Sequence, residues 1–169
     1  MILVLYDTLL LLATPVILAY YLLRLMRRRR GRQGIRERFG ILSHSKLQKL
    51  RAKPVIWLHA VSVGETMAAR PLIAALRSRF PDHQLLISTT TETGQGVAQG
   101  VAGVGISLYF PFDYRFAVRR ALSLVNPAVV VIVETELWPN FLAEARRQGV
   151  PVVLANGRIS DRSFPRYLR

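Results

Sequence analysis

The sequence predicts an α/β fold in which a Rossmann-like parallel sheet follows an N-terminal membrane-anchor helix. Three observations support this prediction. Residues 2–23 form one long apolar run, a basic segment follows it, and from Val55 onward short runs rich in Val, Ile and Leu alternate with longer amphipathic stretches. Buried parallel strands are nearly continuous apolar runs, and the helices that cover both faces of their sheet separate them in the chain.

Composition narrows the class of protein. The 169 residues are 51% hydrophobic and 20% charged, which excludes an intrinsically disordered chain. There is no Cys, so the sequence excludes a disulfide scaffold, a Cys-ligated zinc site and a thiol nucleophile. The three histidines, His44, His59 and His83, lack the spacing of metal ligands. We expect neither a metal ion nor a cofactor.

The first expected element is an apolar run of 22 residues, Ile2–Leu23, whose only charge is Asp7. As a helix it would be about 33 Å long, enough to cross the hydrocarbon core of a bilayer. Pro15 would kink this helix, which membrane helices tolerate. Tyr20 and Tyr21 near its end suit the bilayer interface. We therefore expect residues 1–26 to be a membrane anchor.

The same residues suggest two alternatives to a spanning anchor. A secretory signal peptide carries positive charges before its apolar core and a small-residue cleavage site after it. Here the charges follow the core and no such site is visible, so we favour an uncleaved anchor. A helix that lies within one leaflet stays open, because Asp7 and Pro15 weaken a strict span. Arg residues after the anchor favour a cytoplasmic location for the rest of the chain.

Positive charge is concentrated directly after the anchor. The chain has 24 Lys and Arg against 10 Asp and Glu, a net charge of +14, and eight Arg residues lie between Arg24 and Arg38, where Glu37 is the only acid. This segment suits a topology signal beside anionic headgroups, or contact with an anionic lipid substrate. A nucleic-acid-binding tail is disfavoured, because the segment abuts the anchor and carries no interleaved aromatic residues. We expect a basic, partly helical linker over residues 27–53.

Residues 54–169 are expected to form the sheet and its covering helices. The expected strands, in chain order, are Val55–Val61, Leu85–Thr89, Ile106–Phe112, Ala128–Glu134 and Val150–Ala155. The stretches with helical spacing between them are Glu65–Arg79, Gly94–Ala102, Tyr114–Val125 and Leu137–Gln148. Pro71 must lie in the first turns of its helix or bend it. The expected strand order is 3-2-1-4-5.

This strand order predicts where a ligand binds. In open parallel sheets the binding crevice lies beyond the carboxyl ends of the strands, at the point where the strand order reverses. For order 3-2-1-4-5 that point lies between the first and fourth strands. The segments expected to border the crevice are therefore His59–Thr66 and Glu134–Asn140, and both carry carboxylates.

Glu65 has two interpretations that the spacing leaves open. Gly64 would let the backbone approach a ligand, and Glu65 could project into the crevice as a general base toward a sugar hydroxyl. Ser62 and Glu65 also fit a capping box, in which the Glu side chain bonds back to the Ser62 amide.

Glu134 closes an otherwise apolar strand, and a carboxylate is costly there unless it is paired or faces a polar cavity. This favours a functional role. Glu136 has a simpler explanation, since an acid near a helix N-terminus is favourable. Trp138 and Pro139 are expected to serve packing.

Two further strand ends carry polar residues. Thr89–Gly94 offers hydroxyls and amides at a helix start, which suit phosphate or sugar oxygens, although Thr and Gly also build turns. Arg158 follows the fifth strand and could hold an anionic group or lie on a solvated loop. After the first strand there is no G-x-G-x-x-G, and nowhere is there a G-x-x-x-x-G-K-[ST], so a dinucleotide oxidoreductase and a P-loop NTPase are disfavoured.

Taken together, these motifs resemble a known family. In order and spacing behind a basic anchor, the chain resembles the N-terminal half of 3-deoxy-D-manno-octulosonic acid (Kdo) transferases, which add Kdo to lipid A precursor. The resemblance is carried by Glu37-Arg38-Phe39-Gly40, His59-Ala60-Val61-Ser62-Val63-Gly64-Glu65, Thr89-Thr90-Thr91-Glu92-Thr93-Gly94, Glu134-Thr135-Glu136-Leu137-Trp138-Pro139-Asn140 and Ala155-Asn156-Gly157-Arg158.

The resemblance implies a GT-B glycosyltransferase with an N-terminal acceptor domain and a C-terminal domain for the CMP-Kdo donor. By this resemblance Glu65 is the general base and Glu134 stabilises the transition state. The acceptor-binding residues implied are Ser62, Gly64, Thr90, Thr91, Gly94 and Arg158. The resemblance also implies the cytoplasmic face of the inner membrane as location. No counterpart of the donor domain is expected within these 169 residues. The alternative function is a membrane-anchored, non-catalytic binding module for an anionic lipid or sugar.

Overall fold

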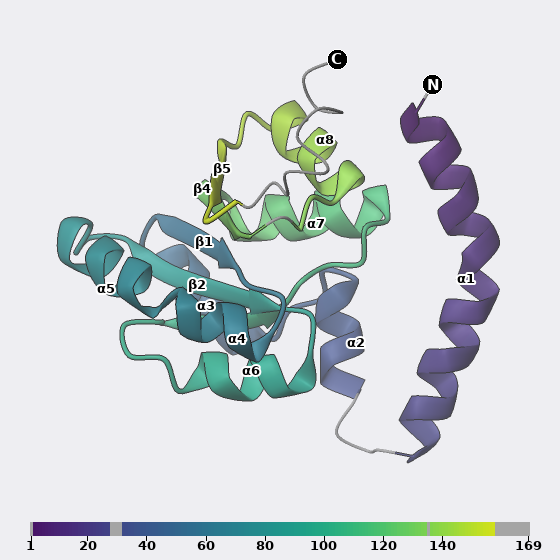
Figure 1. The fold of residues 1–169 in the computed structure, drawn as a ribbon, viewed down its shortest axis with the longest axis horizontal. Helices are drawn as coiled ribbons and strands as arrows, with labels where there is room; N and C mark the ends of the chain where they lie inside the picture. Colours follow the sequence, from purple (N-terminus) through teal and green to yellow (C-terminus); the bar gives the residue numbers. More distant parts are fainter. Residues whose placement is uncertain (1, 28–31, 135, 158–169) are drawn as a thin grey trace.

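The computed structural model describes residues 2–27, 32–134 and 136–157, and it has the architecture that the sequence predicts. A five-stranded, all-parallel sheet has helices on both faces, and the long first helix runs along one side of the molecule (Figure 1). The strands are β1 (Val55–His59), β2 (Gln84–Thr89), β3 (Ile106–Tyr109), β4 (Pro127–Val133) and β5 (Val152–Ala155). The helices are α1 (Ile2–Arg27), α2 (Arg32–Arg38), α3 (His44–Ala52), α4 (Val63–Ala68), α5 (Arg70–Arg79), α6 (Glu92–Gln99), α7 (Arg115–Val125) and α8 (Pro139–Arg147).

The strand order is β3-β2-β1-β4-β5, which confirms the predicted order. β1 lies at the centre and pairs with both β2 and β4. All its residues are buried, as expected for a strand covered on both faces. Because the chain runs from β1 outward to β3 and then crosses to β4, the switch point lies between β1 and β4.

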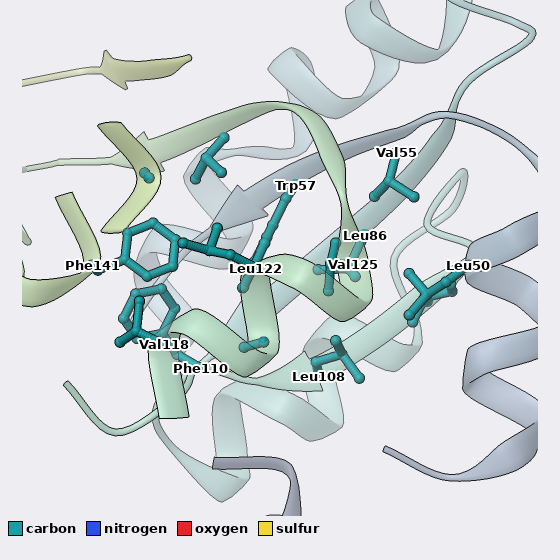
Figure 2. Close-up of a cluster of buried hydrophobic side chains, with 14 of the residues drawn as sticks. Leu50, Val55, Trp57, Leu86, Leu108, Phe110, Val118, Leu122, Val125 and Phe141 are labelled. Carbon is teal, nitrogen blue, oxygen red and sulfur yellow. The ribbon is translucent and has the colours of Figure 1, made fainter. Parts of the chain in front are cut away.

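The alternation of side chains along the strands divides the core into two layers. Val55 and Trp57 of β1 face α3, α7 and α8, whereas Ile56 and Leu58 face α5 and α6. On the first face Trp57, Phe110 and Phe141 form an aromatic group, with ring centroids of Trp57 and Phe141 5.4 Å apart (Figure 2). Both layers are filled by the apolar residues of the predicted strands and helices.

One predicted helix is two in the structure. The sequence predicted a single helix over Glu65–Arg79, but α4 ends at Ala68 and α5 begins at Arg70. The break has the cause that the sequence indicated: Pro71 cannot donate a backbone hydrogen bond, and it occupies the first turn of α5. The short α4 begins soon after β1 ends and therefore lies in the switch-point region.

The basic segment before the sheet folds onto it. Glu37 of α2 is buried, and its carboxylate accepts hydrogen bonds from Lys46 Nζ at 2.6 Å and from the Tyr109 backbone amide at 3.1 Å. A Cβ on Gly34 would lie 2.9 Å from the Tyr109 ring, so the absent side chain lets α2 approach β3. Leu50 of α3 joins the core beneath α7. The division of the chain at residues 26 and 53 stays a prediction.

Within the described residues, α1 is the one helix long and apolar enough to cross a membrane, over Leu3–Tyr21 with a mean hydropathy of 1.9. It also contacts the body of the protein. Asp7 forms an ion pair with Arg115 at 2.9 Å and accepts a hydrogen bond from Asn140 Nδ2 at 2.7 Å. These contacts join α1 to the N-terminal ends of α7 and α8.

Candidate functional site

Three carboxylates belong to the switch-point region beyond β1 and β4. Glu65 belongs to α4, which follows β1, and Glu134 and Glu136 belong to the segment between β4 and α8. Burial raises the pKa of Glu136, and the negative charges of Glu65 and Glu134 raise it further. This shift indicates that the two segments that the sequence singled out lie near each other. It also gives Glu136 a place in the site, beyond the helix-terminal role that the sequence indicated.

Glu65 is half-buried and both of its carboxylate oxygens are hydrogen-bonded. Oε2 accepts the Val61 backbone amide at 2.7 Å, and Oε1 accepts the Ser62 hydroxyl at 2.9 Å. The Ser62 hydroxyl in turn accepts the Glu65 amide at 3.3 Å and so caps α4. The predicted capping arrangement therefore exists, but the prediction that Glu65 bonds to the Ser62 amide was wrong. The carboxylate reaches one residue further back, to Val61.

Gly64 lies in the first turn of α4 with open space beside it. A Cβ built at this position would have only the Ser62 hydroxyl near it, at 3.8 Å. The fold does not require glycine here for steric reasons. A missing side chain beside Glu65 instead leaves room for a ligand to approach the backbone, as the sequence analysis expected.

Glu134 has a left-handed backbone conformation with φ of 65°. This region is costly for a residue with a Cβ, by about 1–2 kcal/mol. The Glu134 amide donates to the Ala155 carbonyl at 2.8 Å, continuing the pairing of β4 with β5 beyond the last strand residue. The turn in the backbone ends the strand and leaves the side chain half-buried at the carboxyl edge of the sheet. Backbone strain of this kind is concentrated at functional sites.

The Thr89–Gly94 segment uses its hydroxyls to hold local structure. Thr91 caps α6 by accepting the Gly94 amide at 3.0 Å, and Thr90 Oγ1 donates to the Val61 carbonyl at 3.1 Å. A Cβ on Gly94 would lie 2.7 Å from the Thr91 hydroxyl, so this cap requires glycine. The Thr90 bond ties this loop to the segment before Glu65. The predicted acceptor-binding roles of these residues stay predictions.

Arg38 belongs to the Glu37-Arg38-Phe39-Gly40 motif and lies in this region, although its sequence position alone indicates no role for it. It is buried, its guanidinium donates to the Thr90 carbonyl, and it lies 4.8 Å from the ring centroid of Tyr109. Arg38 thus connects α2 to the loop beside the site. No local spacing could have revealed this, because the partner lies 52 residues away. Arg158, which the sequence placed at the same edge, lies outside the described residues.

His59, the last residue of β1, is completely buried against the Phe110 ring, with centroids 3.7 Å apart. Its Nδ1 lies 3.1 Å from the Ser88 carbonyl oxygen. Burial, together with the positive charge of Arg38, lowers the pKa of His59 to about 3. The imidazole is therefore neutral at physiological pH and serves the core beneath the site. Among the described residues no three His, Asp or Glu side chains are arranged to hold a metal ion.

Comparison with known proteins agrees with this geometry. The family described as 3-deoxy-D-manno-octulosonic-acid transferase (kdotransferase) matches residues 33–169. Proteins named 3-deoxy-D-manno-octulosonic acid transferase in several organisms are similar to this chain, among them the following three. The Haemophilus influenzae protein is 34% identical over 96% of this chain and 38% of its own length. The Chlamydia pneumoniae protein is 30% identical over 96% of this chain and 37% of its own length. The Bordetella pertussis protein is 40% identical over 64% of this chain and 26% of its own length.

The chain thus spans less than two-fifths of the length of these curated relatives. Among solved structures, the D-arabinose dehydrogenase from Sulfolobus solfataricus matches 80% of this chain and 42% of its own, at 11% identity and a TM-score of 0.38. The family match covers the whole sheet and every carboxylate of the site. The chain therefore belongs to the 3-deoxy-D-manno-octulosonic acid (Kdo) transferase family.

Proposed function

We propose that this chain is the acceptor-binding half of a Kdo transferase, which transfers Kdo from CMP-Kdo to lipid A precursor at the cytoplasmic face of the inner membrane. The observation that carries the proposal is that Glu65 and Glu134, in a chain of this family, both lie near enough to Glu136 at the switch point to raise its pKa. A half-buried carboxylate beside open space at Gly64 suits the activation of a sugar hydroxyl.

Glu65 acts as the general base in this proposal. A sugar hydroxyl has a pKa far above neutral, so a carboxylate cannot remove its proton in advance. It can accept the proton while the new bond to the anomeric carbon of Kdo forms, a contribution of about 100- to 10,000-fold. The cap does not exclude this role, because each carboxylate oxygen has a second lone pair beyond the one that accepts from Val61 or Ser62.

Glu134 supplies negative charge near the reacting centre. Departure of CMP leaves positive charge on the Kdo ring in the transition state, and a fixed carboxylate stabilises such charge. The hydrogen bond from the Glu134 amide to the Ala155 carbonyl helps to hold the backbone at its strained φ of 65° at the sheet edge. Glu136, whose pKa is raised, is the third carboxyl of this group.

The basic residues fit an acceptor that carries phosphate. The net charge is +14, and Arg residues are concentrated directly after α1, where phosphates of a lipid headgroup would lie. In this proposal Arg158 and the loop around Thr90, Thr91 and Gly94 contact the acceptor together with Ser62 and Gly64. Nucleic acid is not an expected partner.

A non-catalytic binding module is the second candidate. It is favoured by the cap geometry, since both Glu65 oxygens already accept hydrogen bonds from the local backbone and side chain. Such a module would bind the lipid through its basic surface, and Glu65 would serve only to start α4. The two candidates differ in what a Glu65 variant does to sugar transfer.

Binding of the chain to bis-phosphorylated lipid A precursor in detergent micelles tests the acceptor assignment. The comparison ligands are the same lipid after removal of its phosphates, and an RNA of similar charge. We expect tight binding only to the phosphorylated lipid. Equal affinity for both lipid forms at low salt would overturn the assignment, and preferred binding to the RNA would replace it with a nucleic-acid function.

A further inference from the structure

Helix α1 contacts the body of the protein along a narrow stripe. Its half-buried residues recur at alternating spacings of three and four, which places them on one side of the helix. These residues include Leu3, Asp7, Leu10, Thr14, Ile17 and Tyr21. A sustained stripe of this kind is typical of a helix that packs along its length against a partner. A helix held only at its end would show no such pattern.

Specific contacts occur at both ends and in the middle of this stripe. Asp7 pairs with Arg115 at 2.9 Å, the Thr14 hydroxyl lies 2.8 Å from the Tyr114 hydroxyl, and the Tyr21 ring lies 5.2 Å from Phe112. From Asp7 to Tyr21 the helix axis advances about 21 Å. The body of the protein therefore lies alongside α1 over most of the apolar length of the helix, as Figure 1 also shows.

The opposite side of α1 is apolar and uncovered. Leu12 is 71% exposed and Val16 is 74% exposed, and Leu5, Leu9 and Leu23 are also mostly exposed. A row of large aliphatic side chains in water is unfavourable, at about 25 cal/mol for each Å² of apolar surface. Because exposure of these side chains to water is costly, we expect the uncovered side of α1 to contact an apolar partner.

A bilayer-spanning orientation conflicts with the contacts on the other side. If α1 crossed the bilayer, its partners near Asp7 would lie about 21 Å deeper than those near Tyr21. Those partners include Arg115 at the start of α7, whose side chain is 48% exposed. The cost of carrying charged side chains into the hydrocarbon is several kcal/mol for each residue. The docked helix can meet lipid only along its uncovered side.

We propose that α1 lies in the plane of the membrane, with Leu5, Leu9, Leu12, Val16 and Leu23 in the hydrocarbon of one leaflet and the body on the same side of the bilayer as both ends of the helix. This inference rests on the membrane association that belongs to the proposed function. The occupant of the uncovered face is a bilayer that contains anionic lipid, because the Arg-rich segment directly after α1 complements anionic headgroups.

The neighbouring surface of the body extends this membrane face. Beside α1, a cavity of about 240 Å³ is lined by Leu11, Leu18, Phe39 and Phe116, among other apolar and aromatic residues. Phe116 is itself 60% exposed. In a spanning orientation this cavity, which Leu11 and Leu18 of α1 line, would lie at the depth of the hydrocarbon together with the charged start of α7. With α1 in the plane, the cavity and Phe116 meet the same leaflet as the helix.

The absence of Cys makes the depth of each position directly measurable. Single variants Leu5→Cys, Leu12→Cys, Val16→Cys and Leu23→Cys of the full chain are spin-labelled and bound to vesicles of phosphatidylcholine and phosphatidylglycerol. Gln48→Cys on the exposed side of α3 is the matched control in water. The spin relaxation caused by oxygen, which is enriched in the bilayer, is compared with that caused by a nickel chelate, which stays in water. The ratio of the two effects gives the depth of each label in the membrane. We expect one shallow depth, about 5–10 Å, at all four positions of α1.

A depth that is greatest at Leu12 and falls toward Leu5 and Leu23 would overturn the proposal in favour of a spanning helix. A second measurement uses Val4→Cys, an exposed position near the N-terminus, and a membrane-impermeant maleimide. We expect labelling only from the side that labels Gln48→Cys, and labelling only from the opposite side would contradict the proposal. Failure of the chain to float with the vesicles would overturn the membrane association itself, which separates the two hypotheses.

Discussion

Glu134 combines a strained backbone with a proposed role in transfer. Its φ of 65° is a conformation that glycine adopts freely. Glu134→Gly should raise the free energy of unfolding by about 0.5–1 kcal/mol, because relief of strain exceeds the added flexibility of the unfolded chain. The same change should lower Kdo transfer about 100-fold by removing the charge. Denaturant unfolding and a transfer assay measure the two effects.

Two variants serve as controls for this prediction. Glu134→Gln keeps the backbone strain and removes only the charge, so transfer should fall without a change in stability. Asn126, at the C-terminal end of α7, has φ of 44°, and Asn126→Gly changes strain far from the site. It should leave transfer intact. Full transfer by Glu134→Gly would show that this carboxylate has no part in the reaction.

His59 predicts a pH dependence of stability. Burial lowers the pKa of His59 to about 3 in the folded protein, against about 6.5 in the unfolded chain. Between these values the unfolded chain binds a proton that the folded protein does not, so stability falls as the pH decreases from 6.5 toward 3. From pH 6 to pH 4 this group alone should remove about 2 kcal/mol.

The measurement compares denaturant unfolding of the parent and of His59→Asn at pH 6 and pH 4. The variant is less stable at both values, but its loss between them should be smaller by the amount due to His59. His44→Asn, at an exposed position, should behave as the parent. Identical losses in the parent and His59→Asn would mean that the buried imidazole takes up no proton on unfolding.

At the scale of the secondary-structure elements, α1 is part of the folded body as well as the candidate membrane helix. Asp113 links them, since its carboxylate accepts the backbone amides of Asn140 and Phe141 at 3.0 and 2.8 Å and so caps α8. Asn140 then donates to Asp7. Burial raises the pKa of Asp113, although these amides oppose the shift. α1, α7 and α8 thus meet in one polar network.

Asp7→Leu tests this docking. The change keeps α1 apolar but removes the ion pair with Arg115 and the acceptor for Asn140. We expect a loss of about 1–3 kcal/mol, seen as a decrease of several degrees in Tm in detergent micelles. Asp7→Asn keeps an oxygen acceptor and should lose less. A Tm unchanged by Asp7→Leu would mean that α1 does not dock on the body.

The elements themselves could be predicted from local patterns, whereas their contacts could not. Apolar runs predict all five strands to within three residues at each end, because periodicity is a property of neighbouring residues. Pro71 indicated a helix start or a bend, although not the division into α4 and α5. The bond from Asn140 to Asp7 joins residues 133 apart, and that from Arg38 to Thr90 joins residues 52 apart. No local signal distinguishes such a residue from a solvated one.

The candidate site was predictable to a similar extent. The strand order placed the switch point, and with it Glu65 and Glu134, because the topology brings strand ends together whatever their side chains are. The left-handed turn at Glu134 and the choice of Val61 as the partner of Glu65 depend on how the strand ends pack. The contribution of Glu136 appears only when the three carboxylates are placed in space.

At the scale of the whole molecule, charge and apolar surface lie next to each other. Replacement of Arg27, Arg28, Arg29 and Arg30 by Gln tests how far charge determines membrane binding. Each Arg near an anionic surface contributes about 1 kcal/mol, so affinity for vesicles that contain phosphatidylglycerol should fall about 100- to 1,000-fold at low salt. Affinity for purely phosphatidylcholine vesicles should not change. An equal loss with both vesicles would show that the variant disturbs the fold or α1 rather than the charge.

Glu65 is the central residue of the proposed function. It takes part in the cap of α4 and is proposed to accept the proton of the acceptor's sugar hydroxyl. Glu65→Gln can keep the cap, since its amide oxygen can accept from Val61 and its amide nitrogen can donate to Ser62. Glu65→Ala loses the cap and about 0.5–2 kcal/mol of stability. Neither side chain can take up a proton during attack on the donor.

The decisive measurement is Kdo turnover by Glu65→Gln, in the whole transferase with CMP-Kdo and lipid A precursor both saturating, beside its Tm and its affinity for the acceptor. We predict an unchanged Tm, an unchanged affinity and a kcat that is about 100-fold lower or more. A kcat close to that of the parent would contradict the account. Glu65 would then be only the cap of α4, and the proton acceptor would have to be sought at Glu134 across the switch point.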